Sequence, residues 1–244
     1  EGKPSENAIL TDRVIDRPMR PLFPKDYRND VALNNLVMSV DPDCSPELTA
    51  MLGSAIATAI SDIPFDGPTA STMVGLIDGE FVINPTSAQK EVSDLALTVA
   101  STREKVIMIE AGANEIPEAK MIEAIFEADK VNKEIIAFID KIVADCGKEK
   151  HSYESCAVPE ELFAAMKEIV TPEQMEEAVF TDDKQTREAN IRAIEEKLEE
   201  RYAENEEWLA QIGEAVYAFQ KKTVRKMILK DHKRPDGRDI KQIR

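Results

Sequence analysis

The chain has 244 residues, of which 43% are hydrophobic, and its formal net charge is −16. This length is sufficient for one or two domains with a buried core, and the hydrophobic content excludes a wholly disordered chain. The acidic balance excludes a uniformly basic nucleic-acid-binding surface, because affinity for phosphate comes largely from Lys and Arg.

The first feature along the chain is an arginine run in residues 11–24, TDRVIDRPMRPLFP. A local basic site is feasible here, because residues 1–30 contain six acids and six bases. Arg13, Arg17 and Arg20 are four and three residues apart, which gathers side chains on one helix face. The two prolines predict a short helix that ends near Arg17 and a rigid extended exit that carries Arg20. The three guanidinium groups could converge on one anionic ligand, such as a phosphate.

The same run also has a purely structural interpretation. Several aspartates lie close by, and Asp16 is placed to pair with Arg13 or with Arg20. Ion pairs of this kind at a surface contribute little to stability and require no ligand. Spacing alone therefore leaves phosphate binding and surface ion pairing open as alternatives.

The next segments predict a strand, a turn and a helix. Residues 31–40, VALNNLVMSV, are apolar and β-branched, which is typical of a strand. Asp41 and Asp43 are a conceivable metal-binding pair, but the adjacent prolines favour turn residues. Ser45 and the Pro-Glu pair after it predict the start of a helix that extends to about residue 62, because they offer a cap, a first-position proline and a first-turn acid.

Two hairpins and a long helix are predicted after this helix. Asp78-Gly79 is a strong tight-turn signal between strands at residues 73–77 and 80–84. A second pair of strands is predicted at residues 95–100 and 106–110. Residues 117–144 carry apolar side chains at helical spacing. Hairpins with amphipathic helices indicate an α+β layer.

The second half of the chain is predicted to be helical. Apolar stripes predict helices at residues 159–169, 184–203 and 206–230, and Thr171 with Gln174 has the capping-box pattern of another. Together these stripes indicate a small helical bundle. Five basic residues between 221 and 230 are expected to interact with the end of the last helix, and an additional RNA contact is the alternative.

Cysteine and histidine usage argues against a zinc site, and the lengths of the apolar runs argue against a membrane span. Cys44, Cys146 and Cys156 show no C-x-x-C spacing, and there are two histidines. An odd, sparse cysteine count is typical of a reducing cytoplasm, and no apolar run approaches the length of a membrane span. The opening EGKPSEN is not a signal peptide and has no initiating Met, so we expect a cytoplasmic piece of a longer protein.

Several stretches resemble one known family. IDRPMRPLFP, VMSVDPDCSPELTAMLGSAIATAISDIPFDGP, VGLIDGEFVINPT, LALTVAST and KRPDGRDIKQIR resemble bacterial polynucleotide phosphorylase, a polyribonucleotide nucleotidyltransferase. The resemblance implies an α+β, ribonuclease-PH-like core, similar to the second domain of ribosomal protein S5, followed by an all-α bundle. It implies a first core at residues 1–147 that lacks its N-terminal strands, a helical linker domain at 148–232 and the start of a second core at 233–244.

The resemblance also implies an activity. The family degrades mRNA from the 3′ end by phosphorolysis, with inorganic phosphate as co-substrate and Mg²⁺ as cofactor. Its members are cytoplasmic homotrimers that bind single-stranded RNA and, in some cases, other RNA-degradation proteins. Arginines of the segment that contains Arg13, Arg17 and Arg20 line the RNA path in the family.

The catalytic groups of the family are expected elsewhere. The catalytic core of the family has an Asp-x-Lys pattern at the end of a strand, where this sequence has Ala96-Leu97-Thr98. A methyl group cannot bind Mg²⁺ and a hydroxyl carries no positive charge, so we expect no catalytic residue and no metal ligand here. The chain is then expected to scaffold the trimer and guide RNA, and to be inactive alone. The alternative is an acidic helical module that binds proteins and has no direct role with RNA.

Overall fold

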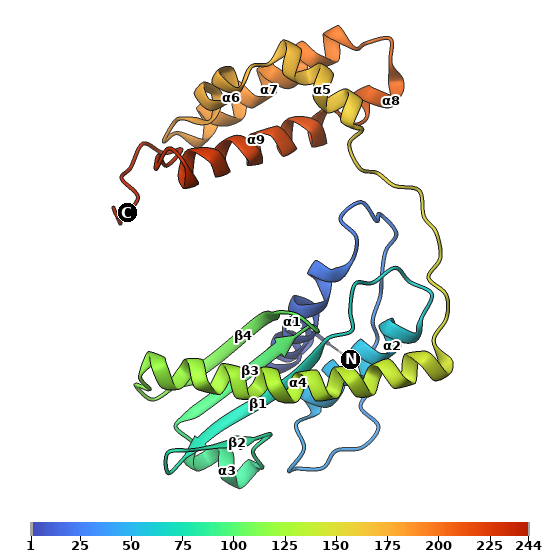
Figure 1. Cartoon of the computed structure of the whole chain (residues 1–244), viewed down its shortest axis with the longest axis vertical. Helices are drawn as coiled ribbons and strands as arrows, with labels where there is room; N and C mark the ends of the chain where they lie inside the picture. Colours follow the sequence, from blue (N-terminus) through green and yellow to red (C-terminus); the bar gives the residue numbers. More distant parts are fainter. Residues whose placement is uncertain (1, 244) are drawn as a thin grey trace. The chain divides into compact units, whose positions relative to one another are not determined.

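The computed structural model describes residues 2–243, and these divide into two compact units after Cys156. Figure 1 shows the order of the elements in each unit. The first unit contains the sheet and the second is entirely helical, as expected for an α+β core followed by an all-α bundle. The domain limits expected at residues 147 and 232 stay a prediction.

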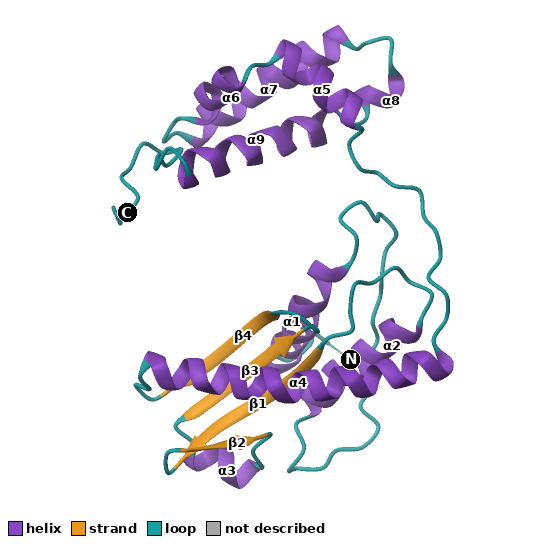
Figure 2. Cartoon of the chain, viewed as in Figure 1, coloured by secondary structure: helices purple, strands orange, loops and turns teal. Residues whose placement is uncertain are grey.

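The first unit is built on a four-stranded antiparallel sheet with the order β2-β1-β3-β4 (Figure 2). Its strands are β1 (Ala70–Ile77), β2 (Glu80–Ile83), β3 (Leu95–Ser101) and β4 (Val106–Ala113). Asp78 and Gly79 have positive φ angles of 51° and 84° between the paired Ile77 and Glu80, as a tight hairpin turn requires. Both predicted hairpins are therefore confirmed.

Helices pack on both faces of this sheet. The predicted long helix is confirmed as α4 (Glu118–Cys146), which packs Ala124 and Ala128 against Leu97 on one face. On the opposite face, α1 (Glu6–Met19) packs Met19 against Ala100. Figure 1 draws α4 in front of the sheet and α1 behind it. Helix α1 therefore lies on the same face of the sheet as Ala100. Because side chains alternate along a strand, Ala96 and Thr98 of β3 belong to this face as well.

Two other helices belong to this unit. The helix predicted from Ser45 is confirmed as α2 (Pro46–Ile60), and the hydroxyl of Ser45 accepts a hydrogen bond from the N–H of Leu48. Ala55 and Ala59 of α2 are small enough to let it approach Ile139 of α4 closely. The short helix α3 (Ser87–Val92), which begins at a capping box, was not predicted from its sequence.

The prediction of a helix end near Arg17 is wrong. The helix continues through Pro18 to Met19, and a 3-10 helix, η1 (Arg20–Leu22), follows in place of an extended exit. A proline inside a helix removes one hydrogen bond and crowds the preceding turn. Here Pro18 and Met19 are both buried, so burial of this face against α2 and the sheet offsets that cost.

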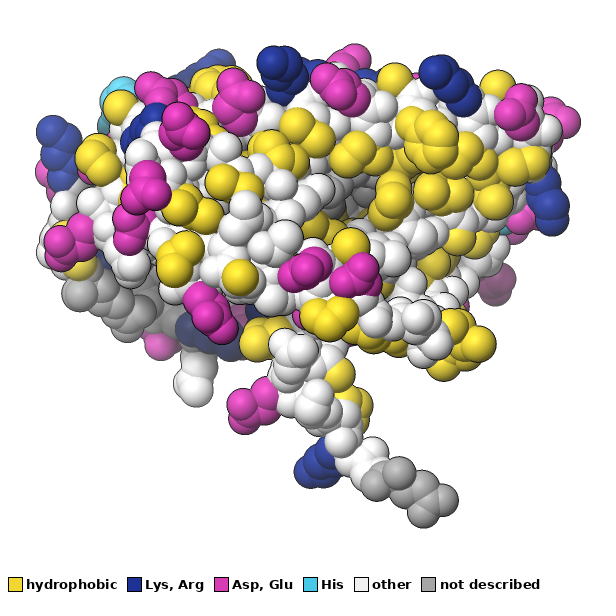
Figure 3. All heavy atoms as spheres, turned by 90° about the horizontal axis from the view of Figure 1, so that it is seen from below, with side chains coloured by type: hydrophobic (Ala, Val, Ile, Leu, Met, Phe, Trp, Pro, Cys, Tyr) yellow, Lys and Arg dark blue, Asp and Glu magenta, His cyan; other side chains and the backbone are white. Residues whose placement is uncertain are grey.

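The prediction of a strand at residues 31–40 is also wrong. In the structure this segment is an irregular loop, with Leu36 80% and Met38 85% exposed. An apolar segment forms a strand only where a neighbour completes its hydrogen bonds, and the structure describes no strand beside this one. Figure 3 views the first unit from the side on which Figure 1 draws α3, and hydrophobic side chains gather on that face.

The connector after α4 is held to the first unit by hydrogen bonds. The ammonium of Lys150 donates to the carbonyls of Thr58, Ala59 and Ser61 at the end of α2, at distances of 3.1, 3.0 and 2.6 Å. A cation is favourable at this position because the last carbonyls of a helix lack partners and carry partial negative charge. The hydroxyls of Ser155 and Tyr153 donate to Asp26, which lowers the pKa of that carboxyl.

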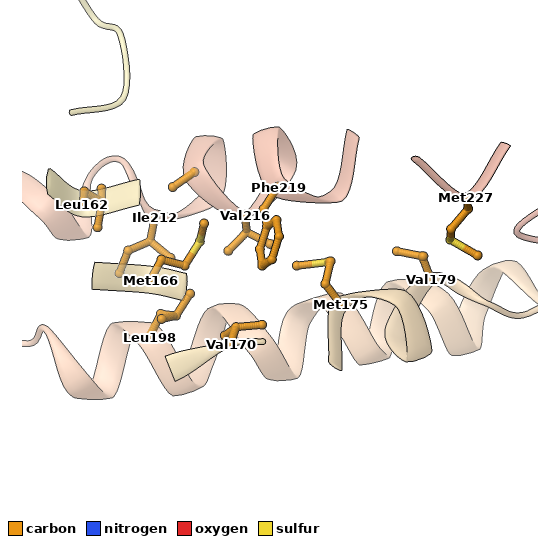
Figure 4. Close-up of a cluster of buried hydrophobic side chains, with 11 residues drawn as sticks. Leu162, Met166, Val170, Met175, Val179, Leu198, Ile212, Val216, Phe219 and Met227 are labelled. Atoms are coloured by element: carbon orange, nitrogen blue, oxygen red, sulfur yellow. The ribbon is translucent and has the colours of Figure 1, made fainter. Parts of the chain in front are cut away.

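The second unit is a helical bundle. Its helices are α5 (Glu160–Ile169), α6 (Pro172–Val179), α7 (Lys184–Arg201), α8 (Glu206–Leu209) and α9 (Ile212–Leu229). Figure 4 shows the side chains of the core meeting between α9 and α7, with Phe219 and Met166 among them. The predicted stripes and the capping box of Thr171 with Gln174 are confirmed.

The prediction of one continuous helix at residues 206–230 is wrong. The chain turns at Ala210 and Gln211, which separates α8 from α9. Trp208 before the turn packs edge-on against Tyr202, with ring centroids 5.0 Å apart, and Ile212 after it is buried in the core. Trp208 and Ile212 are four residues apart and would also share one face of a straight helix, so their packing does not by itself explain the turn.

Candidate nucleic-acid interface

Helix α1 places the predicted arginines on the surface. The hydroxyl of Ser5 caps its first turn, and Ile15, Pro18 and Met19 bury its inner face. Arg13, Arg17 and Arg20 are therefore exposed, but they do not converge on one point, because each has different surroundings. The convergence expected from spacing is not present in this conformation.

Arg17 is engaged with the sheet. Its guanidinium lies 2.6 Å from the carboxylate of Glu110 on β4, and both side chains are about half exposed. Glu110 is the cross-strand partner of Thr98 on β3. The structure therefore brings together two segments that the sequence singled out separately, the arginine run and the Ala96-Leu97-Thr98 strand.

Arg13 and Arg20 line a separate surface groove of about 620 Å³. The aromatic ring of Tyr27 and the amide of Asn29 contribute to the same groove, which offers apolar and hydrogen-bonding groups beside the guanidiniums. Among residues 2–243 Arg13 forms no ion pair, so its guanidinium is available to a ligand. This makes Arg13 the best-placed of the three arginines for an anion.

Acids are also present in the groove. Arg20 lies 2.8 Å from Asp16, as the spacing predicted, and this hydrogen bond raises the pKa of Arg20 above its usual value. Asp12 and Asp30 line the groove as well. A polyanion would therefore compete with carboxylates for Arg20, although an exposed ion pair contributes only about 0–1 kcal/mol and is readily exchanged.

The sheet face beside Arg17 does not fit a magnesium ion. Ala96 and Thr98 point to this face with Glu110, and none of them is paired with a second carboxylate that would complete a metal site. Within residues 2–243 no group of three His, Cys, Asp or Glu side chains could hold a metal ion. The two acids at the earlier turn, Asp41 and Asp43, are turn residues as favoured, because Asp41 accepts a hydrogen bond from the N–H of Asp43.

Glu110 is the site residue that the sequence interpretation missed. It lies 93 positions from Arg17, and no local spacing rule connects two such distant residues. A weak signal was present, because Glu110 is an acid that interrupts the apolar strand VIMIEAGA.

Comparison with known protein families agrees with this architecture. Residues 67–131 match the model of the 3′ exoribonuclease family, domain 2, and residues 161–239 match that of the polyribonucleotide nucleotidyltransferase RNA-binding domain. The fold and these matches define the chain as a ribonuclease-PH-like α+β core followed by an all-α domain. Curated relatives include the polyribonucleotide nucleotidyltransferases of Lachnoclostridium phytofermentans, 79% identical, and Ruminiclostridium cellulolyticum, 49% identical, each over the whole of this chain. The chain belongs to the polyribonucleotide nucleotidyltransferase family.

The match covers part of these relatives. The chain spans 35% of the length of the Lachnoclostridium and Ruminiclostridium proteins. Among solved structures, rice Rrp46 is similar over 59% of this chain and 68% of its own, with 13% identity and a TM-score of 0.46. None of the helices described for residues 2–243 has both the length and the hydropathy that a membrane-spanning helix needs.

Proposed function

We propose that the chain is the RNA-guiding segment of a cytoplasmic polyribonucleotide nucleotidyltransferase, a phosphorolytic 3′-to-5′ exoribonuclease of mRNA degradation. The observation that carries this proposal is 79% identity over the whole chain to a protein of that name. In the proposed reaction, inorganic phosphate attacks the last phosphodiester of the RNA. The bond to the 3′ oxygen of the preceding nucleotide breaks, and a nucleoside diphosphate leaves.

In this proposal the chain binds single-stranded RNA and scaffolds a homotrimer. Arg13 contacts phosphate first, because it is exposed and lacks an acid partner among the described residues. Arg20 joins by exchanging Asp16 for phosphate, which costs little at an exposed position. Arg17 contributes last, because Glu110 already neutralises it.

The proposal places the chemical step outside this chain. Phosphoryl transfer requires groups that neutralise the charge of the reacting phosphate, which Mg²⁺ and basic side chains commonly do. Ala96 and Thr98 supply no such charge, and Arg17 beside them is paired with Glu110. We therefore expect the parent enzyme to hold Mg²⁺ and use phosphate elsewhere, and this chain to be inactive alone.

The test measures RNA binding and activity separately. Affinity for a labelled oligoadenylate is measured across a salt series for the chain and for Arg13→Gln/Arg17→Gln/Arg20→Gln. If Arg13 and Arg20 contact phosphates while Arg17 stays paired with Glu110, the slope of log K against log salt becomes smaller by about 1.4, from roughly 0.7 per contact. A control with three arginines of α7 changed, Arg187→Gln/Arg192→Gln/Arg201→Gln, should keep its slope.

Two outcomes would refute this proposal. Equal slopes for the α1 variant and the α7 control would remove the RNA-guiding role from the three arginines. Release of ADP from oligoadenylate by the purified chain in the presence of phosphate would overturn the inference that it is inactive alone. Each outcome rejects a different part of the proposal.

A second candidate function is an acidic module that binds protein partners, such as other components of RNA degradation. Its supporting observation is the exposed, Glu-rich surface of α7 and the segment after it. A pull-down with residues Ala157–Arg244, which form a compact unit with its own core, would test it. Recovery of one specific partner together with no RNA binding by the whole chain would favour this second function.

A further inference from the structure

The connector, residues 147–156, is bonded to the loop that follows the arginine run, and both belong to the first unit. The hydroxyls of Tyr153 and Ser155 donate to the carboxylate of Asp26. The N–H of Cys156 donates to the backbone carbonyl of Asp26 at 3.4 Å. The side chain and the backbone of this one loop residue are therefore both tied to the connector.

Aromatic contacts extend this attachment to Tyr27. Its ring lies edge-on to that of Tyr153, with ring centroids 5.1 Å apart, which is a favourable arrangement of two aromatic rings. Its hydroxyl lies 3.2 Å from Nε2 of His151, and the amide of Asn29 donates to the same hydroxyl at 3.5 Å. A chain of contacts thus leads from the connector through Tyr27 to Asn29.

Tyr27 and Asn29 belong to one wall of the groove that Arg13 and Arg20 line. This wall has neither helical nor strand structure, so it lacks the repeating backbone hydrogen bonds of those elements. Such a segment opens locally at low cost unless other contacts tie it down. The connector supplies these contacts from outside the groove, because all the residues that line the groove precede α2 in the chain.

The same attachment holds a carboxylate away from the groove. Three acids already line it beside the two guanidiniums, namely Asp12, Asp16 and Asp30. Asp26 does not line the groove, and the two connector hydroxyls engage its carboxylate. Release of the connector would free Asp26 as a fourth acid beside the groove, and each added carboxylate repels a polyanion. Docking of the connector therefore favours an anion in the groove.

We propose that Tyr153 and Ser155 are positioning residues for the groove of Arg13 and Arg20, and that connector docking and binding of single-stranded RNA in this groove strengthen each other. The choice of RNA as the ligand rests on the proposed function. The coupling is reciprocal, because each event changes the free energy of the other by the same amount. The connector directly precedes the second unit in the chain, so occupancy of the groove controls how firmly the segment that leads to that unit is held.

The first experiment removes two hydroxyls and no charge. In Tyr153→Phe/Ser155→Ala, which we call the hydroxyl variant, Asp26 loses both side-chain donors. The control, Ser152→Ala/Tyr217→Phe, removes two exposed hydroxyls that form no hydrogen bond within the described part of the chain. The hydroxyl variant should bind labelled oligoadenylate about 5-fold more weakly than the control, which is the lower end of typical coupling between sites. The salt slope should stay unchanged, because no cation is removed.

The second experiment measures the same coupling at the connector, by hydrogen exchange of the Cys156 amide. In the unmodified chain, saturating oligoadenylate should slow this exchange about 5-fold, because reciprocity requires the same factor for docking as for binding. In Arg13→Gln/Arg20→Gln the same RNA concentration should leave the exchange unchanged. A merely structural role of the connector hydroxyls would not link this amide to RNA. Ser155→Thr keeps a hydroxyl donor and should bind oligoadenylate as the unmodified chain does.

The outcomes separate this inference from the proposed function. If the hydroxyl variant binds as its control does while Arg13→Gln/Arg20→Gln binds more weakly with a smaller slope, this inference alone is overturned. Exchange of the Cys156 amide that does not respond to bound RNA overturns it as well. If the unmodified chain binds no oligoadenylate, both this inference and the RNA-guiding role are rejected.

Discussion

The ion pair of Arg17 and Glu110 yields a prediction in which removal of an acid improves RNA binding. Both side chains are about half exposed, so the pair stabilises the fold by about 0–1 kcal/mol. Glu110→Gln keeps the size of the side chain, removes its charge and releases Arg17. One new phosphate contact by Arg17 should raise the affinity for single-stranded RNA about 5-fold at 0.1 M salt and increase the slope by roughly 0.7.

The control for this prediction is Glu123→Gln. Glu123 is also exposed and paired with a base, Lys120, at 3.2 Å, so its replacement changes the net charge of the chain equally. Affinity for labelled oligoadenylate is measured by fluorescence anisotropy for both variants. An equal gain in both would indicate a general charge effect.

A double-mutant cycle completes the test. If the gain of Glu110→Gln arises from Arg17, the double variant Arg17→Gln/Glu110→Gln should lose it, because the group that makes the new contact is absent. The reasoning fails if the double variant retains the gain, or if Glu110→Gln alone binds no better than the unmodified chain. Thermal unfolding of the unmodified chain, Arg17→Gln, Glu110→Gln and the double variant checks that each of the four proteins is folded.

Three further predictions concern stability. Lys150→Met should lower the free energy of unfolding by about 1–2 kcal/mol in denaturant titration, because three carbonyls at the end of α2 lose an exposed, charge-assisted donor. Hydrogen bonds from Ser155 and Tyr153 lower the pKa of Asp26, so they stabilise the docked connector fully at pH values above the unfolded pKa of about 3.9, and this stabilisation is lost as the pH falls through the folded pKa. Hydrogen exchange of the connector should become faster over that pH range. In Asp26→Asn the exchange of the connector should no longer depend on this titration. Met166→Ala in the fully buried core of the second unit should cost about 2–5 kcal/mol, whereas Met38→Ala in the exposed loop should cost little.

Local signals predicted local structure well. The turn at Asp78-Gly79, the cap at Ser45 and the capping box at Thr171 each depend on residues a few positions apart, and all three are confirmed. The apolar stripes of the second unit are also confirmed. They are local signals too, because apolar residues at helical spacing predict which face of a helix is buried. The α+β class followed from the hairpins and the helices that cover them.

Features set by distant partners were not predictable in this way. Residues 31–40 have strand composition but remain a loop, because backbone hydrogen bonds between strands need a neighbour. Pro18 stays in a helix because burial of its face outweighs the local preference of proline. The spacing allowed Asp16 to pair with Arg13 or with Arg20, and it pairs with Arg20, whereas the pairing of Arg17 with Glu110 depends on how α1 packs on β4.

This packing bears directly on what the sheet face can do. A residue that bound a reacting phosphate would need to present its charge without a permanent partner. Arg17 is paired with Glu110, the cross-strand partner of Thr98, so the face holds a balanced pair where catalysis would need excess positive charge. Arg13, which forms no ion pair among residues 2–243, lies on an open surface groove. Charge is therefore available where a flexible polyanion can be guided and is neutralised where a reaction would have to be catalysed.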